Sequence, residues 1–303
     1  MERAGRAKLR RGQSFATHAL RSRSTQETLR VVSVTPISNP TIATGVIVEA
    51  CVDSVESARA AEAGGAGRIE LSANLYEGGT SPSPGLMALT RERVRIPIHV
   101  LVRPRGGDFM YDEDEVRVML GDIAFAKAVG VDGIVLGALF ADGSVDDRST
   151  RVLVEAARPL SVAFHRAFDL VRDPFEALDT LVALGVDRVL TSGGAATALD
   201  GLETLAALAW RSEGRSTITA AGGITEHNVG RIIAEAGVHE VHVRASKRRD
   251  SEMRFRREGV TLGKSYVPDE YARVVTTADL VKMVVSASTE AAAPHAVSEP
   301  AAD

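Results

Sequence analysis

The chain has 303 residues, of which 45% are hydrophobic and 25% charged, a composition typical of a globular protein with a large core. A net charge of −4 and an aromatic content of 4% argue against a nucleic-acid partner. No run of about 20 apolar residues predicts a membrane helix, so we expect no membrane partner either. Cys51 is the only cysteine, which excludes an internal disulfide and a paired-cysteine metal motif.

Both ends of the chain differ in composition from its middle. Residues 1–44 carry a charge of +6, whereas the remaining residues carry −10, and this Arg- and Ser-rich segment has no sustained helical or strand period. The pattern predicts a disordered basic extension, although a transit peptide or a misplaced start site would have the same composition. Residues 287–303, rich in Ala and Pro, predict a disordered tail, so we place the folded domain at 45–286.

Between these ends, short β-branched runs alternate with segments of helical pattern. Eight such runs predict strands, at Val46–Ala50, Arg68–Leu71, Ile98–Val102, Gly133–Leu136, Ser161–His165, Arg188–Thr191, Thr217–Ala220 and Glu240–Val243. Each interval between strands has room for one helix, and no strand is left over. The sequence therefore predicts an α/β fold, a closed (β/α)₈ TIM barrel, rather than an open doubly wound sheet.

Residues that favour helix ends punctuate this pattern. Asp112 and Asp173 precede helical segments as side-chain caps, and Pro174 suits the first helical position. Gly130 and Gly185 lie where helices are expected to end. These signals place the helices between the predicted strands, as a barrel requires.

Ionisable residues gather near the carboxyl ends of the predicted strands, where barrels of this type carry their active sites. Alternation along each strand turns their side chains into the barrel. The candidate catalytic residues are Glu49, Glu70, His99, Arg103, His165 and Asp169. His242 and Arg244 share an inward face of the eighth strand, but we assign them no role.

Two interpretations of these residues remain open. Buried carboxylates and imidazoles are costly unless paired, so they could form a structural layer of Glu–Arg and Glu–His pairs. Alternatively, a crowded carboxylate with a raised pKa could act as acid or base while Arg103 binds an anionic substrate. No lysine lies within a predicted strand, which argues against a Schiff-base aldolase.

Glycine pairs after several strands point to an anion site. Backbone N–H groups near Gly193, and at Gly222 and Gly223, could hold a phosphate, with Arg105 adding positive charge at the barrel mouth. The alternative is a set of tight turns, which also require glycine. No glycine pair follows the eighth strand, so the predicted phosphate cradle is incomplete.

The single cysteine lies at the end of the first predicted strand. A thiolate is a natural ligand for Cu(I), so Cys51 is the candidate metal ligand. One thiolate does not complete a copper site, and a His, a Met or a partner chain would have to supply the next ligand. The alternative is a buried thiol with no special chemistry.

Together, these strand-end sequences resemble the CutC family of copper homeostasis proteins. The resemblance extends from about Val46 to Ser286, and its most specific strings are Arg-Pro-Arg-Gly-Gly-Asp-Phe at 103–109 and Phe-His-Arg-Ala-Phe-Asp at 164–169. It implies a cytoplasmic TIM barrel that forms a homo-oligomer, a dimer or tetramer, and takes part in copper binding and trafficking. Many members carry a second cysteine where this chain has Ser72.

Two functions follow from these observations. The first is a role in copper homeostasis, with Cu(I) binding weakened because the second thiol of the family is missing. The second is a TIM-barrel enzyme that acts on a small anionic or phosphorylated metabolite through Glu and His acid–base chemistry. The polar strand ends favour the enzyme, and the resemblance favours the copper protein.

Overall fold

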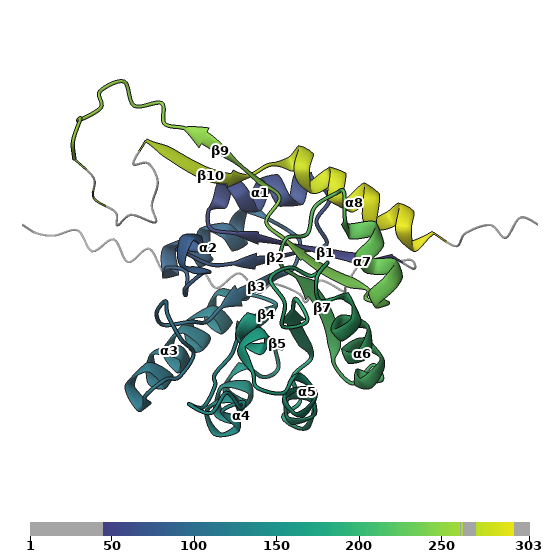
Figure 1. Cartoon of the computed structure of the whole chain (residues 1–303). Coiled ribbons are helices and arrows are strands. Elements are labelled where there is room, and N and C mark those ends of the chain that lie inside the picture. Colours follow the sequence, from purple (N-terminus) through teal and green to yellow (C-terminus); the bar gives the residue numbers. More distant parts are fainter. Residues whose placement is uncertain (1–44, 261, 263–270, 294–303) are drawn as a thin grey trace, which may run out of the picture. The chain divides into compact units, whose positions relative to one another are not determined.

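Eight parallel strands pair in sequence order, and the last pairs with the first to close the barrel (Figure 1). The strands are β1 (Ile47–Val52), β2 (Arg68–Leu71), β3 (Ile98–Leu101), β4 (Gly133–Leu136), β5 (Ser161–Phe164), β6 (Arg188–Thr191), β7 (Thr217–Ala221) and β8 (Glu240–Val243). The computed structural model describes residues 45–260, 262 and 271–293, so the predicted extension at 1–44 lies outside the described residues. The predicted TIM barrel is confirmed.

Helices follow the strands and cover the outside of the barrel (Figure 1). They are α1 (Val55–Ala63), α2 (Pro84–Arg93), α3 (Glu113–Val129), α4 (Asp147–Ala157), α5 (Pro174–Ala183), α6 (Leu202–Ser212), α7 (Val229–Ala236) and α8 (Ala278–Ala292), with the short 3₁₀ helices η1 (Leu75–Glu77) and η2 (Arg166–Leu170). Every predicted strand forms, with bounds that match the prediction or differ by one or two residues. None of the described helices is both long and apolar enough to cross a membrane.

The predicted helix caps are present. The Asp112 side chain accepts a hydrogen bond from the backbone N–H of Glu115, and the Glu115 side chain accepts one from Asp112 in return. Asp173 caps α5 by accepting from two backbone N–H groups, and Gly130 ends α3 with a φ of 81°. A side-chain cap stabilises a helix by about 1 kcal/mol, so these residues fix where the loops end and the helices begin.

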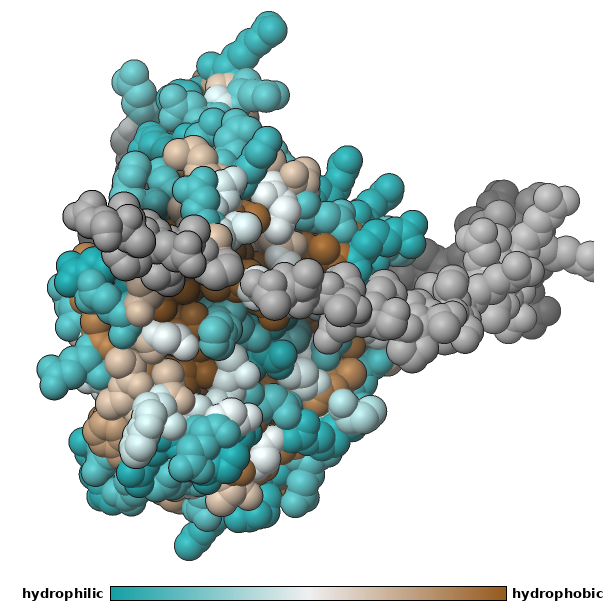
Figure 2. Space-filling view, turned by 90° about the vertical axis from the view of Figure 1, so that its right-hand side faces the viewer, coloured by the Kyte–Doolittle hydropathy of each residue, from teal (hydrophilic) through white to brown (hydrophobic). Residues whose placement is uncertain are grey.

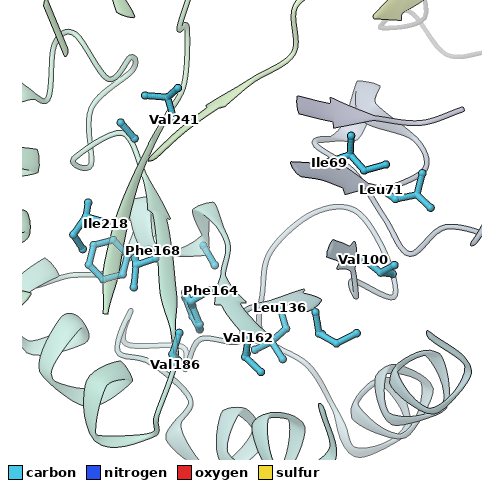
Figure 3. Close-up of a cluster of buried hydrophobic side chains, with 14 of the residues drawn as sticks. Ile69, Leu71, Val100, Leu136, Val162, Phe164, Phe168, Val186, Ile218 and Val241 are labelled. Atoms are coloured by element: carbon cyan, nitrogen blue, oxygen red, sulfur yellow. The ribbon is translucent and has the colours of Figure 1, made fainter. Parts of the chain in front are cut away.

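Alternate residues of each strand point outward and form the main core against the helices. Figure 3 shows buried members of this core, including Ile69, Leu71, Val100, Leu136 and Phe164. Burial of one such side chain contributes about 1.5–3 kcal/mol to stability. Because the strand period is two, this outward packing turns the intervening residues, such as Arg68 and Glu70, into the barrel.

The barrel interior has an apolar half and a polar half. Inward side chains of β3 to β7 form a small apolar cluster of Leu101, Val135, Ala163, Leu190 and Ala221. Inward side chains of β8, β1 and β2 are ionisable instead, namely Glu49, Cys51, Arg68, Glu70, Glu240 and His242. The polar half is therefore centred on the first two strands and the last, and His99 of β3, Arg188 of β6 and Thr219 of β7 extend it.

Two glycines near β4 make room for imidazole rings from the neighbouring strands. A Cβ atom at Gly133 would lie 2.5 Å from Nε2 of His99. A Cβ atom at Gly137, just beyond β4, would lie 2.5 Å from Cε1 of His165. Such contacts are far shorter than van der Waals distance, so both positions require glycine.

The chain after β8 forms a hairpin and ends in the last helix. β9 (Ser246–Asp250) pairs antiparallel with β10 (Ala272–Thr276), and Figure 1 shows the hairpin extending away from the barrel. α8 then continues to Ala292, so the predicted start of a disordered tail at 287 is too early. Alanine favours helices, and the buried Ser288 packs this turn against the barrel. Residues 294–303 of the predicted tail lie outside the described residues.

Part of the described surface is apolar. In Figure 2, hydrophobic side chains gather near the centre of the face shown, and hydrophilic side chains surround them. At the amino ends of the strands, a hollow of about 660 Å³ is lined in part by Val46, Ile47 and Val238. This end lies opposite the carboxyl ends of the strands, where the sequence predicts the functional residues.

Candidate functional site

A layer of paired charges lies inside the barrel near the amino ends of β2, β6 and β8. The Arg68 guanidinium donates to Glu49 through Nε and to Glu240 through Nη2, the latter over 2.6 Å. Arg188 Nε and Thr219 Oγ1 donate to the same Glu240 carboxylate over 3.2 and 3.0 Å. This part of the interior fits the structural interpretation, because its buried charges are paired and hydrogen-bonded.

Beside this layer, three side chains that can bind a metal ion converge from adjacent strands. Cys51 Sγ, a carboxylate oxygen of Glu70 and a ring nitrogen of His242 all lie within 4.8 Å of one another. Cys51 Sγ is 3.6 Å from Glu70 Oε1, and the two residues are partners in the β1–β2 ladder. His242 joins them because barrel closure pairs β8 with β1. We call Cys51, Glu70 and His242 the ligand cluster.

Glu49 orients the imidazole of His242. Glu49 Oε1 lies 2.8 Å from His242 Nδ1, while Oε2 of the same carboxylate accepts from Arg68. A nitrogen of the ring held in this way lies within 4.8 Å of the Cys51 thiol. Metal-binding histidines are commonly fixed by a carboxylate on the second ring nitrogen. Glu49 is therefore a positioning residue rather than a ligand.

The charges around the ligand cluster depend on one another. Burial would raise the pKa of Glu49, but Arg68 and the hydrogen bond to His242 hold that pKa well below its usual range. Burial, with the charge on Glu49, raises the pKa of Glu70. Burial would lower the pKa of His242, but Glu70 and the hydrogen bonds to Cys51 and Glu49 raise it well above its usual range. Burial, with Glu70, raises the pKa of Cys51, so a metal ion must displace protons from the thiol and the imidazole to bind.

The donor set of the ligand cluster suits copper better than a hard cation. Copper prefers thiolate and imidazole ligands, whereas Ca²⁺ and Mg²⁺ take oxygen ligands. In zinc sites with the same donors, bonds are about 2.0–2.3 Å long, so ligand atoms up to about 4.3 Å apart can share one ion. The separations of up to 4.8 Å need only a small inward movement. Ser72 Oγ, 4.0 Å from Cys51 Sγ, is a hard donor and does not replace a second thiolate.

His99 and His165, both predicted as acid–base residues, are held neutral. Burial and the charge on Arg68 lower the pKa of His99 to about 3, although its Nδ1 lies 3.9 Å from Glu49 Oε2. Burial and the charge on Arg103 lower the pKa of His165 to about 3. An acid–base residue works best with a pKa near the operating pH. These two rings are therefore poorly suited to proton transfer near pH 7.

Arg103 and Arg105, predicted to bind a substrate anion, hold loops at the barrel mouth. Arg103 donates to three backbone carbonyl oxygens, those of Glu77, Gly79 and Gly107. Arg105 pairs with Glu115 and Asp108. Because both guanidinium groups are engaged within the protein, the structure does not bring either of them to the ligand cluster as an anion-binding group.

Asp169 and Gly193 shape a neighbouring loop. The Asp169 carboxylate pairs with Arg166 over 2.6 Å. It also accepts hydrogen bonds from three groups at the end of β6 and just beyond it, the Thr191 hydroxyl and the backbone N–H groups of Ser192 and Gly194. Gly193 has a φ of 74°, and a Cβ atom there would lie 2.5 Å from the carbonyl oxygen of Gly201. Asp169 therefore positions Arg166, and Gly193 fits the tight-turn interpretation.

Gly222 and Gly223 line a pocket at the carboxyl ends of β7, β8 and β1. The pocket has a volume of about 540 Å³, and two members of the ligand cluster, Cys51 and His242, contribute to its wall. Pockets that bind small molecules commonly have volumes of about 300–1,000 Å³. The structure therefore joins the predicted glycine pair to the predicted metal ligand in one hollow.

Comparison with known protein families shows which group of barrels this is. The family model described as the CutC family matches residues 46–247. The chain belongs to the CutC family. The match includes all eight barrel strands and the whole ligand cluster, so the resemblance found in the sequence is confirmed.

Individual relatives agree with this assignment. The copper homeostasis protein cutC homolog of Mus musculus is 49% identical over 238 residues, covering 78% of this chain and 88% of the relative. The human homolog of the same name is 48% identical over 240 residues, covering 79% and 88%. A solved structure, the putative copper homeostasis protein CutC from Streptococcus agalactiae, superimposes with a TM-score of 0.63 at 32% identity, over 66% of this chain and 98% of that one. CutC proteins and copper homeostasis are thus the context in which the ligand cluster must be understood.

His242 belongs to the ligand cluster, although the sequence alone assigns it no role. It lies 191 positions after Cys51 in the sequence. The signal that could have found it is barrel closure, because an eighth parallel strand must pair with the first. An inward residue of the last strand then lies beside an inward residue of the first.

Proposed function

We propose that this CutC-family chain binds one copper ion, as Cu(I), between Cys51 and His242, with Glu70 beside them. The observation that carries the proposal is the convergence of a thiol, an imidazole and a carboxylate within 4.8 Å inside the barrel. The names of the mouse and human relatives, copper homeostasis protein cutC homolog, support it. The proposed setting is the cytoplasm, where thiols are kept reduced.

Each polar residue has a part in this proposal. Cys51 gives the soft thiolate ligand, and His242 gives a nitrogen ligand whose ring Glu49 holds in place. Arg68 keeps Glu49 ionised and so available to the imidazole. Cu(I) binding releases protons from the Cys51 thiol and the His242 imidazole, so affinity rises with pH.

The missing second thiol limits the proposed affinity. Ser72 occupies the position where many family members carry cysteine, and its hydroxyl lies 4.0 Å from Cys51 Sγ. We therefore expect Ser72→Cys, kept reduced, to bind Cu(I) at least tenfold more tightly than the parent, a gain of about 1.4 kcal/mol. Equal affinities would show that the second position contributes no ligand.

The direct test is an anaerobic Cu(I) titration against a coloured chelator of known affinity. We expect the parent chain to take one Cu(I) ion from the chelator. Cys51→Ser should take no measurable Cu(I), and His242→Gln should bind Cu(I) at least tenfold more weakly than the parent. His227→Gln is the matched control, because the His227 side chain is 84% exposed and is not a member of the ligand cluster. Binding by Cys51→Ser that equals the parent would refute the proposal.

We further propose that the chain forms a homo-oligomer, a dimer or tetramer. The segment after β9 exposes Met253 and Phe255, with 61% and 66% of their surface accessible. Large apolar side chains exposed together often mark a protein interface. Light scattering at micromolar concentration tests this, with Met253→Ser/Phe255→Ser as the dissociating variant. A monomeric parent would contradict the proposal.

A further inference from the structure

The pocket beside the ligand cluster is lined by two arginines and by two of the proposed copper ligands. Arg166 and Arg244 line it together with Cys51 and His242. A pocket with basic groups and a soft metal ligand in one hollow is suited to a small molecule that carries both an anionic group and a sulfur atom.

Two hydrogen bonds fix the Arg166 guanidinium, and its third nitrogen, Nη1, makes none within the described residues. Its Nε donates to Asp169 over 2.6 Å and its Nη2 donates to Ser192 Oγ over 3.0 Å. Nη1 lies over Gly222, 3.4 Å from the point where a Cβ atom would be. Gly222, with a φ of 99°, therefore lets the guanidinium lie close to the backbone at the pocket wall.

Arg244 is less constrained. It follows His242 by two residues at the end of β8, so both side chains face the barrel mouth. Within the ranges that the structure describes, its half-buried guanidinium makes no hydrogen bond or close ion pair, although it feels the charge of Asp53. A half-buried cation without a hydrogen-bonded partner is well placed to accept an anion.

The turn after β7 adds backbone donors. In the part of the chain that the structure describes, the N–H groups of Gly223 and Ile224 donate to no other residue, and both residues line the pocket. Two guanidinium groups and two backbone N–H groups thus belong to residues that line one hollow, whose wall also includes the carboxylate of Glu226. This arrangement matches a carboxylate, which accepts several charge-assisted hydrogen bonds.

The ligand cluster has one soft donor, Cys51, and lacks a second. Cys51 is its only sulfur, and Ser72 offers a hard hydroxyl where a second sulfur would favour Cu(I). A thiol that enters through the pocket would reach the metal from the same hollow that Cys51 and His242 line.

We infer that this pocket binds a small thiol bearing a carboxylate, whose carboxylate lies against Arg166 and Arg244 and whose sulfur completes the copper site beside Cys51 and His242. The inference rests on the proposed copper function and names the ligand that makes good the missing second thiol. On binding, the entering thiol loses its proton to solvent as the sulfur–copper bond forms, and copper stays Cu(I) throughout.

Counting sulfur atoms around the bound metal tests this inference. X-ray absorption is recorded on full-length protein loaded anaerobically with Cu(I), alone and after addition of 3-mercaptopropionate, 2-mercaptoethanol or propionate at equal concentration. We expect one sulfur per copper without additive, two with 3-mercaptopropionate, and one with propionate. 2-Mercaptoethanol, which lacks the carboxylate, should need at least tenfold higher concentration to give the second sulfur.

Variants identify the residues responsible. The double variant Arg166→Gln/Arg244→Gln should still hold its copper. At the concentration of 3-mercaptopropionate that gives two sulfur atoms per copper in the parent, the double variant should show only one. Arg231→Gln is the matched control, because Arg231 is 60% exposed on α7 and removal of its charge should change nothing. Three results would overturn the inference: one sulfur with every additive, equal response to the two thiols, or an unaltered response in the double variant. A parent that holds no copper in any arm overturns the proposed function and this inference together.

Discussion

The two halves of the barrel interior share one strand geometry but carry different kinds of inward side chain. Toward the carboxyl ends of β3 to β7, inward side chains such as Leu101, Val135 and Leu190 are apolar and pack as any core does. From β8 through β1 to β2, the inward positions hold charges and a thiol instead. The apolar half contributes hydrophobic stability, and the polar half gives up that contribution to assemble the ligand cluster.

The contrast shows which polar residues serve the fold and which serve the site. Arg68, Glu240 and Arg188 pair fully near the amino ends of the strands, so they compensate their own burial. Burial raises the pKa of Cys51 and of Glu70, so the fold holds both groups in an environment that opposes their charged forms. Unfavourable environments of this kind are typical of functional sites.

The largest effect is expected from breaking the ion-pair layer of the polar half. Arg68→Met removes the partner of Glu49 and Glu240 and leaves two buried carboxylates with fewer compensating charges. We expect a loss of about 3–5 kcal/mol in the free energy of unfolding, measured by urea denaturation. Arg211→Met is the control, because its pair with Asp179 is about half exposed and should change stability by at most about 1 kcal/mol. Similar losses of unfolding free energy in both variants would mean that the ion-pair layer stabilises the barrel no more than an exposed pair does.

A substitution that leaves a cavity in the apolar half tests how much that half contributes to stability. Leu190→Ala removes buried methyl groups from the inner cluster and should cost about 2–5 kcal/mol in the same assay. Cu(I) affinity of the folded variant should match the parent, because no member of the ligand cluster is in that half. A loss of copper binding in parallel with stability would show that the two halves are not separate.

The stability of the chain should depend on pH, because His99 and His165 are buried in their neutral form. The pKa of His165 is lowered to about 3 in the folded chain, against about 6.5 when unfolded. The unfolded state therefore binds more protons below pH 6.5, and stability is lost as pH falls toward 3. By pH 5 this residue alone should cost about 2 kcal/mol. Urea denaturation at pH 7 and pH 5 checks this, and His165→Gln should lose less stability than the parent over that interval; an equal loss would contradict the assignment.

The smallest expected effect is a difference in sign between substitutions of Glu70 and Glu49, two of the glutamates of the polar half. Glu70 has a raised pKa, so Glu70→Gln removes an unfavourable charge and should raise the free energy of unfolding at pH 7 by about 0.5–1 kcal/mol. Glu49 has a lowered pKa because Arg68 and His242 favour its charge, so Glu49→Gln should be destabilising. Thermal and urea unfolding of both variants test the opposite signs. If both substitutions destabilise the chain, Glu70 also belongs to the stabilising layer of paired charges.

The sequence predicted the barrel and the inward orientation of its polar residues, because both depend on a period of two and on short-range caps. Arg68–Leu71 and Gly133–Leu136 form with the expected bounds, and Glu49 and Glu70 face inward as expected. The roles of Arg103 and Arg105 could not be read in this way. Each satisfies groups of nearby loops, and loop conformation follows from tertiary packing rather than from local pattern.

The position of the ligand cluster in the ring has a consequence for the timing of folding. Cys51 emerges early from the ribosome, whereas His242 emerges only after the strands between them have been made. A nascent chain halted before β8 carries a lone thiol and no second ligand, so it offers copper nothing to bind beyond what any exposed cysteine offers. Under the proposed copper function, capture of the metal therefore waits for the completed barrel, and a half-made chain does not sequester it.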